Sequence, residues 1–164
     1  MKRIILGLVL ACALILVASA SADVAYNCAA PCTIKVSISD KFPASEQQII
    51  REVIADFNLS PEINLVEGNG GTIKFVVDPD GGFTTSWRIA GGYLKGAVIH
   101  ITPAFFGWCC DEHDGMRGVY CHELMHGLGI NDFWTRAEPS CFNGTSPYLG
   151  AEDRLWISQS YPVG

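Results

Sequence analysis

The sequence predicts a single α+β domain, in which β-strands and helices follow one another along most of the chain. Three observations favour this fold class. An alternating apolar segment precedes an amphipathic helical segment, glycine-rich turns separate several short apolar runs, and a further helical segment that carries two histidines follows these runs. Residues 23–164 are enough for one domain that buries about two thirds of the surface exposed by its unfolded chain.

Residues 1–22 are predicted to be a secretory signal peptide. The chain opens with a short basic segment, Met1 to Arg3, followed by an apolar run over residues 4–17 and small residues at Ala20 and Ala22. This order is typical of exported proteins, and the run is shorter than the roughly 20 apolar residues that span a membrane. A membrane anchor is the alternative. We therefore expect a secreted protein, extracellular or periplasmic.

The first predicted strand and helix are defined by their apolar periodicity. Residues 32–39 alternate strictly between apolar and polar side chains, as in a half-buried strand. In the helix that follows, Ser45 and Gln48 have the spacing of a capping box, which predicts that the helix begins there and ends near Asn58. The apolar residues that recur at helical spacing are Ile49, Ile50, Val53, Ile54 and Phe57.

Three more strands are predicted, at residues 63–66, 72–77 and 97–102. Each is a short apolar run, and glycine-rich turns separate them. These strands precede the helical segment that carries the most informative residues of the chain.

Residues 122–132 read His-Glu-Leu-Met-His-Gly-Leu-Gly-Ile-Asn-Asp and predict a metal site. His122 and His126 are four residues apart, so a helix presents both imidazoles on one face. Zinc suits this geometry, since a catalytic zinc takes three protein ligands and keeps one open position. Gly129 is predicted to end the helix in the left-handed conformation, and the following turn would deliver Asp132 as the third ligand.

Glu123 is predicted to be the general base of this site. It lies about 100° around the helix from His122, beside the metal and outside its direct ligands. A carboxylate at this place can take a proton from an attacking water and pass it to a leaving amine, which is the chemistry of peptide hydrolysis. The alternative is an amphipathic helix that binds no metal.

The pattern His-Glu-x-x-His-x-x-Gly-x-x-Asp resembles the metzincin clan of zinc metalloproteases, and its aspartate is similar to that of the snapalysin group. The resemblance implies zinc ligation by His122, His126 and Asp132, with Glu123 as general base. Residues 147–162 resemble the C-terminal helix of matrixins, which an acidic pair opens. The implied fold is zincin-like (metzincin-type): a single catalytic domain with a twisted mixed β-sheet, a backing helix, an active-site helix and a C-terminal helix.

The chain departs from the metzincin pattern in one respect, because it has no methionine after Met125. Cys141 lies where the methionine turn is expected, either as a packing residue or in a disulfide. Gluzincins take a glutamate from a later helix as third ligand, so Glu138 and Glu152 are alternatives to Asp132. In metzincins an edge strand pairs with extended substrate, and we assign this role to residues 97–102 as a hypothesis.

Six cysteines follow the predicted signal peptide and allow up to three disulfides among fifteen pairings: Cys28, Cys32, Cys109, Cys110, Cys121 and Cys141. Cys121 directly precedes His122 and points about 100° away from it, which favours a bond that ties the metal helix to a neighbouring loop. The alternatives are zinc ligation by cysteine, and a latent form in which Cys28 or Cys32 occupies the open zinc position.

The charge balance narrows the choice of partners. Without Lys2 and Arg3 the chain has 9 basic against 17 acidic residues, which disfavours nucleic acid and anionic membranes as partners. We therefore expect a monomeric secreted zinc endopeptidase that acts on a protein or peptide substrate. The alternative is a noncatalytic zinc-stabilised secreted protein-binding module, which would not need a general base such as Glu123.

Overall fold

The computed structural model describes residues 24–106, 112–131 and 139–163. The predicted signal peptide, residues 1–22, lies outside the described residues. So do Asp132, Glu138, Cys109 and Cys110. The expectations for these positions therefore stay predictions.

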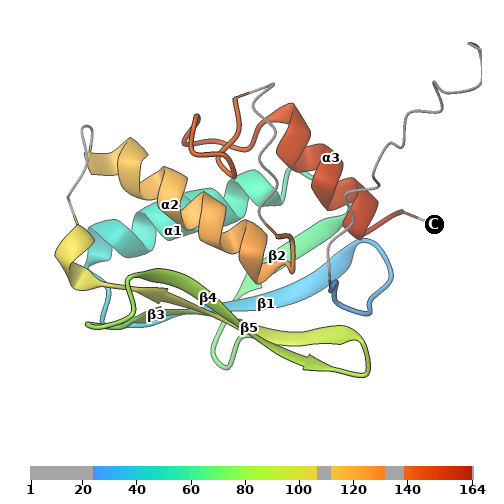
Figure 1. Ribbon diagram of the computed structural model, residues 1–164, viewed down its shortest axis with the longest axis horizontal. Coiled ribbons are helices and arrows are strands. Elements are labelled where there is room, and N and C mark those ends of the chain that lie inside the picture. Colours follow the sequence, from blue (N-terminus) through green and yellow to red (C-terminus); the bar gives the residue numbers. More distant parts are fainter. Residues whose placement is uncertain (1–23, 107–111, 132–138, 164) are drawn as a thin grey trace, which may run out of the picture.

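The described residues form a mixed five-stranded sheet in the order β2-β1-β3-β5-β4. Its strands are β1 (Cys32–Ile38), β2 (Ile63–Glu67), β3 (Ile73–Val77), β4 (Phe83–Ala90) and β5 (Tyr93–Ile101). Neighbouring strands run parallel except for β4, which pairs antiparallel with β5. Helices α1 (Ala44–Phe57) and α2 (Glu112–Gly127) lie on one face of this sheet, and α3 (Ala151–Ser160) follows at the end of the chain (Figure 1).

The core lies between the sheet and its two covering helices. β1 alternates buried and exposed residues at its start, as its sequence predicts. Fully buried side chains from α1, the central strands and α2 meet in this layer, among them Ile50, Phe57, Ile73, Phe75, Ile99, Tyr120 and Leu124. The burial of these side chains fixes the position of α2 over the sheet.

The strands predicted at residues 32–39, 63–66 and 72–77 are confirmed to within one residue at each end. The strand predicted at residues 97–102 is the second half of the longer β5. β4 was not predicted. Gly91 and Gly92, with φ of 63° and 77°, form the tight turn that joins β4 to β5 in a hairpin.

The assignment of residues 97–102 to the substrate-binding edge is wrong. β5 lies between β3 and β4, so its backbone groups are used by ladders on both sides. Within the described part of the chain, β4 forms the edge of the sheet on this side. A peptide that extends the sheet there would pair with β4.

The predicted capping box at Ser45 and Gln48 is also wrong. α1 begins at Ala44, with Pro43 in the N-cap position, and its cap makes no side-chain hydrogen bond. The carbonyl of Pro43 accepts the backbone N–H of Gln47 at 3.0 Å, so the first helical turn forms before Ser45 could cap it. The predicted end is confirmed, since Asn58 caps the helix.

Two disulfides connect described cysteines, Cys28 with Cys32 and Cys121 with Cys141. The second confirms that Cys121 ties α2, the helix with the histidine pair, to a neighbouring loop. The first shows that the latent-form alternative for Cys28 and Cys32 is wrong, because their sulfurs are bonded to each other. None of the helices in the described ranges combines the length and the apolar character needed to cross a bilayer.

Candidate metal centre

The two predicted histidine ligands lie together on α2, and backbone carbonyls orient both rings. His122 Nδ1 is 2.8 Å from the carbonyl oxygen of Phe142, and His126 Nδ1 is 2.8 Å from that of Ile130. A carbonyl oxygen only accepts hydrogen bonds, so each Nδ1 carries the proton in the neutral ring. The lone pair is therefore on Nε2 in both residues, which is the arrangement of a metal-binding histidine.

The two Nε2 atoms are 3.1 Å apart. In the tautomer that the carbonyls select, both of these atoms are acceptors, and a cation between them relieves the repulsion of their lone pairs. Two nitrogen ligands at 2.0–2.1 Å from a tetrahedral zinc are about 3.3 Å apart. The histidine pair thus fits a zinc ion in both chemistry and spacing.

Gly129 ends α2 as predicted, in the left-handed conformation with φ of 83°. The N–H of Gly129 donates to the carbonyl of His126, and the N–H of Ile130 donates to that of Met125, which is a Schellman motif. This turn brings the Ile130 carbonyl back onto the His126 ring. A Cβ at Gly129 would lie 1.9 Å from the carbonyl oxygen of Val24, so the close approach also requires glycine.

The third ligand of the predicted set, Asp132, lies outside the described residues. Across the described positions, no third histidine, cysteine, aspartate or glutamate joins the histidine pair. This counts against Glu152 as the alternative ligand, since Glu152 belongs to the described helix α3. Zinc ligation by Cys121 is excluded as well, because its sulfur is in a disulfide.

Glu123 is buried, with 5% of its surface exposed, and the edge strand β4 holds its carboxylate. Thr85 Oγ1 donates to Glu123 Oε2 at 2.7 Å. Trp87 Nε1 donates to the His126 carbonyl at 2.8 Å, two residues further along β4. Sequence reasoning missed both residues because it missed β4, although the alternation of Phe83, Thr85 and Trp87 was a signal for the strand.

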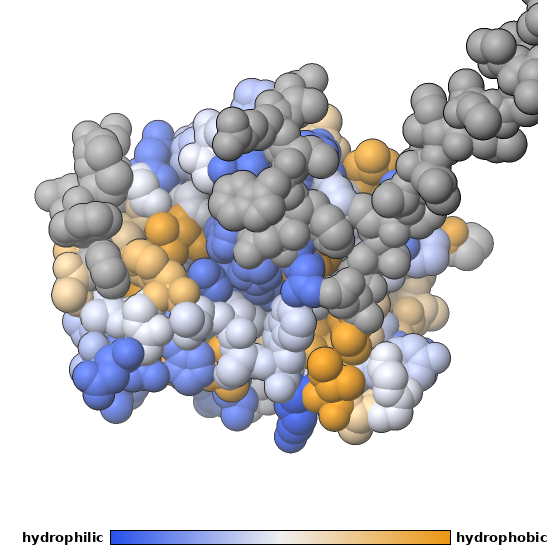
Figure 2. Space-filling view, in the orientation of Figure 1, coloured by the Kyte–Doolittle hydropathy of each residue, from blue (hydrophilic) through white to orange (hydrophobic). Residues whose placement is uncertain are grey.

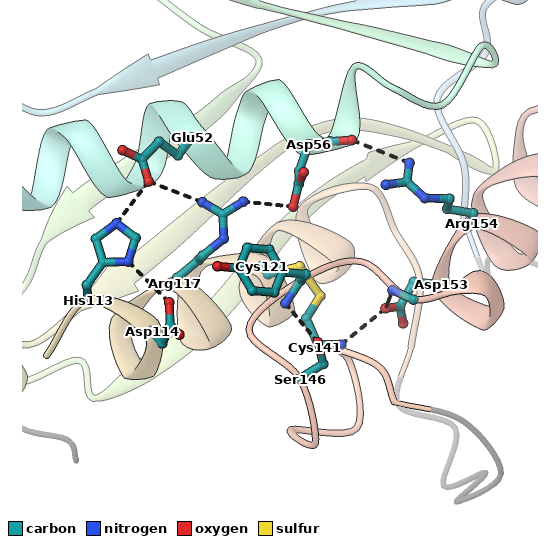
Figure 3. Close-up of polar contacts among 12 residues, drawn as sticks. Glu52, Asp56, His113, Asp114, Arg117, Cys121, Cys141, Ser146, Asp153 and Arg154 are labelled. Carbon is teal, nitrogen blue, oxygen red and sulfur yellow. Dashed lines mark hydrogen bonds and ion pairs between the residues drawn. A yellow bond between two sulfur atoms is a disulfide. The ribbon is translucent and has the colours of Figure 1, made fainter. Parts of the chain in front are cut away.

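The loop that carries Phe142 is fixed by a buried carboxylate and by the disulfide of Cys141. Asp153 accepts hydrogen bonds from the backbone N–H groups of Cys141 and Gly150, at 3.1 and 2.8 Å, and from the hydroxyl of Ser140. Figure 3 shows Asp153 reaching Cys141 beside the Cys121–Cys141 bond. Of the two roles considered for Cys141, the structure therefore shows the disulfide.

A network of charged side chains connects the first half of α2 to α1 (Figure 3). Arg117 pairs with Glu52 at 3.3 Å and with Asp56 at 2.7 Å. His113 contacts Glu52 at 2.9 Å and Asp114 at 3.2 Å. The hydrogen bond to Asp114, and then that to Glu52, raises the pKa of His113 above its ordinary value. This network fixes the helix that carries the histidine pair.

A cleft of about 660 Å³ opens beside His122 and Glu123. Its walls are Phe83 of β4, the first half of α2 with Gly118 and Val119, and the loop over residues 141–147. Figure 2 shows apolar surface on the left of the molecule, over this half of α2, above a polar sheet edge. The cleft can accept an apolar side chain next to the histidine pair.

No protein-family model matches the sequence, and no curated protein matches it either. Two solved structures of myroilysin match this chain, each with 11% identity and a TM-score of 0.57. One match covers 84% of this chain and 96% of the myroilysin chain, and the other covers 88% of this chain and 95% of the myroilysin chain. The chain has the metzincin-like α+β fold. A hatching enzyme zinc-protease from Oryzias latipes, HCE-1, shares 21% identity over 70% of this chain and 51% of its own, with a TM-score of 0.43.

The metzincin-like fold was the fold class that the sequence predicted, including the backing helix α1 and the C-terminal helix α3. At 11% identity, the comparison with myroilysin concerns the course of the backbone alone. The chemistry of this chain therefore has to be argued from its own residues.

Proposed function

We propose that this protein is a secreted zinc-dependent endopeptidase. His122, His126 and Asp132 would hold the metal, and Glu123 would act as general base. The observation that carries the proposal is the pair of Nε2 atoms 3.1 Å apart, together with the buried Glu123, which lines the same open cleft as His122. A site that only stabilised the fold would have no use for such a carboxylate next to an accessible space.

When bound, zinc would polarise the carbonyl of the substrate and make an adjacent water more acidic. Glu123 would take the proton of the attacking water and transfer it to the nitrogen of the leaving amine. Thr85 fixes the carboxylate through Oε2, so the other oxygen is the one that would move the proton. The burial of Glu123 keeps this carboxylate in one orientation while the reaction proceeds.

The substrate would bind as an extended peptide along the outer edge of β4. Such binding adds a strand to the sheet, so that backbone hydrogen bonds hold the peptide and a pocket selects one of its side chains. β4 carries Thr85 and Trp87, which contact the site residues, so a peptide on this edge passes close to the histidine pair. The cleft that Val119 lines would receive the substrate side chain next to the scissile bond.

Secretion belongs to this proposal. The basic and apolar start of the chain and the disulfides at Cys28–Cys32 and Cys121–Cys141 both support it, because disulfides persist in oxidising compartments. We further propose that the mature protein acts as a monomer on protein or peptide substrates.

The proposal is tested with the variant Glu123→Gln. We expect it to bind zinc like the wild type and to lose casein cleavage by a factor of about 10²–10⁴, because the general base is removed. Glu152→Gln is the matched control, and we expect it to keep both zinc and activity. Full activity of Glu123→Gln would contradict the proposed mechanism.

The same experiment separates the alternative function. A zinc-stabilised binding module would bind zinc in the wild type and show a higher melting temperature with the metal, yet would cleave neither casein nor a mixed peptide library. Chelator-sensitive cleavage by the wild type supports the endopeptidase.

A further inference from the structure

We infer that Phe142 is a positioning residue, which holds both histidines of the metal site in their binding orientation. This inference rests on the proposed zinc site and adds a residue outside the predicted ligand set. Two features carry it: the ring of Phe142 contacts both imidazoles, and its backbone carbonyl accepts a hydrogen bond from one of them.

The three rings form one cluster. The centroid of the Phe142 ring lies 5.2 Å from that of His122 and 5.2 Å from that of His126, with interplanar angles of 33° and 69°. The two imidazoles are 4.7 Å apart and nearly perpendicular, at 82°. Tilted and edge-to-face contacts of this kind are the favourable arrangements of aromatic pairs. The phenyl ring therefore restricts rotation of both imidazoles about their side-chain bonds.

The backbone of Phe142 acts on His122 alone. Its carbonyl oxygen accepts the Nδ1 proton at 2.8 Å, which fixes the tautomer and directs Nε2 toward its counterpart on His126. A single residue thus limits the ring angle of both histidines and the proton position of one.

Phe142 can act in this way because its own position is strongly fixed. Its N–H donates to Ser140 Oγ at 3.0 Å, and the hydroxyl of Ser140 donates to the buried carboxylate of Asp153. The neighbouring Cys141 is bonded to Cys121, the residue just before His122. The loop is therefore tied both to α3 and to the metal helix, and Phe142 itself is only 6% exposed.

Rings held at fixed angles lose less freedom when they bind a metal, so Phe142 would raise the zinc affinity of the site. A large aromatic residue that only filled space would contribute to folding and leave this affinity unchanged. The two roles differ in a measurable way.

The test uses Phe142→Leu, which keeps an apolar side chain and the carbonyl but removes the flat ring. We expect the zinc dissociation constant, measured by competition with a chromophoric chelator, to rise about 10-fold, as is typical when groups that orient ligands are changed. The visible absorption bands of the cobalt-substituted protein should also shift. Phe142→Tyr keeps an aromatic ring and should restore both values to those of the wild type.

Phe42→Leu is the matched control, because Phe42 is a buried ring that contacts Phe106 and Tyr120 and neither histidine of the pair. We expect it to lower the melting temperature of the protein while the zinc dissociation constant stays within twofold. A dissociation constant within twofold of the wild type for Phe142→Leu would overturn the inference.

This result is distinguishable from a failure of the proposed function. If the wild type binds zinc and cleaves peptides but Phe142→Leu binds zinc equally well, only the positioning role is overturned. If the wild type binds no zinc, both the proposed metal site and the positioning role of Phe142 are overturned.

Discussion

Each imidazole of the histidine pair is oriented by a backbone carbonyl of a residue that follows α2 in the sequence. Phe142 provides one of these carbonyls and Ile130 the other. The spacing of His122 and His126 puts both rings on one helix face, but these carbonyls determine which nitrogen of each ring points inward. Residues outside the motif, and not the histidine spacing alone, therefore set the orientation of the two rings.

Thr85 is another residue outside the motif that orients a site residue, because its hydroxyl donates a hydrogen bond to the carboxylate of Glu123. In Thr85→Val the methyl group replaces the hydroxyl at nearly constant volume. We expect kcat/KM for a peptide substrate to fall about 10-fold, which corresponds to about 1.4 kcal/mol and lies near the lower end of the roughly 1.5–3 kcal/mol of one hydrogen bond to a charged group. Zinc content should be unchanged.

Two variants control for this effect. Thr85→Ser keeps the hydroxyl and should keep most of the activity. Thr84→Val changes the exposed neighbour on β4 and should have no effect. Equal losses in Thr84→Val and Thr85→Val would show that the strand, and not the hydrogen bond, is responsible.

Gly129 has a positive φ, and the carbonyl oxygen of Val24 occupies the place that a Cβ would take, so its replacement should be costly. We expect Gly129→Ala to lower the free energy of unfolding by about 2–4 kcal/mol, from the left-handed conformation and from the clash with the Val24 carbonyl. Gly70, with φ of 68° and nothing within 4 Å of an added Cβ, is the matched control. Gly70→Ala should cost only about 1 kcal/mol.

Urea unfolding of the two glycine variants gives these values directly. Equal destabilisation of both would mean that the contact of the N-terminal segment with Gly129 contributes nothing.

At the scale of elements, α2 is held to its neighbours by three kinds of interaction. Its first half carries Arg117, which pairs with Glu52 and Asp56 of α1. The disulfide from Cys121 reaches the loop before α3, and hydrogen bonds from Thr85 and Trp87 come from β4. The helix that carries the histidine pair is therefore connected to α1, to the sheet edge and to the loop before α3.

The contact between α1 and α2 predicts a pH dependence of stability. The pKa of His113 is raised above its ordinary value of 6.5, mainly by the hydrogen bond to Asp114 and then by that to Glu52. A raised pKa means that protonated His113 stabilises the folded state; this contribution is complete below pH 6.5 and is lost as the pH rises through the folded-state pKa. Because His113 is half exposed, the effect should be small.

Melting temperatures measured from pH 6 to 9 test this dependence. In the wild type we expect a gradual decrease above pH 6.5, which His113→Gln should reduce. Asp114→Asn should reduce it as well, since that carboxylate is the largest cause of the raised pKa. A decrease of the same size in all three proteins would assign it to other groups.

At the scale of the whole molecule, the elements predicted correctly are those with strong local periodicity. The alternation of β1, the helical spacing of α1 and the position of Gly129 after His126 are all visible within a few residues of sequence. β4 was missed because the polar Thr85 stands between Phe83 and Trp87 on its inner face, so that the apolar alternation of this segment is interrupted.

Interactions between distant segments could not be predicted from local pattern. Thr85 lies 38 residues from Glu123 in the sequence, and only the pairing of β4 with β5 brings it to α2. The edge position of β4 likewise depends on strand order, which no short segment specifies. The histidine spacing indicated where the site lies, whereas the residues that orient it emerged only from the fold.

The central claim is that His122 and His126 hold a zinc ion, and its most direct test is the metal content of the protein without its predicted signal peptide, residues 23–164. After dialysis against metal-free buffer, elemental analysis should give one zinc per chain for the wild type and none for His126→Ala, whose fold is checked by circular dichroism. A zinc-free wild type, or equal zinc in a folded His126→Ala, would contradict the account.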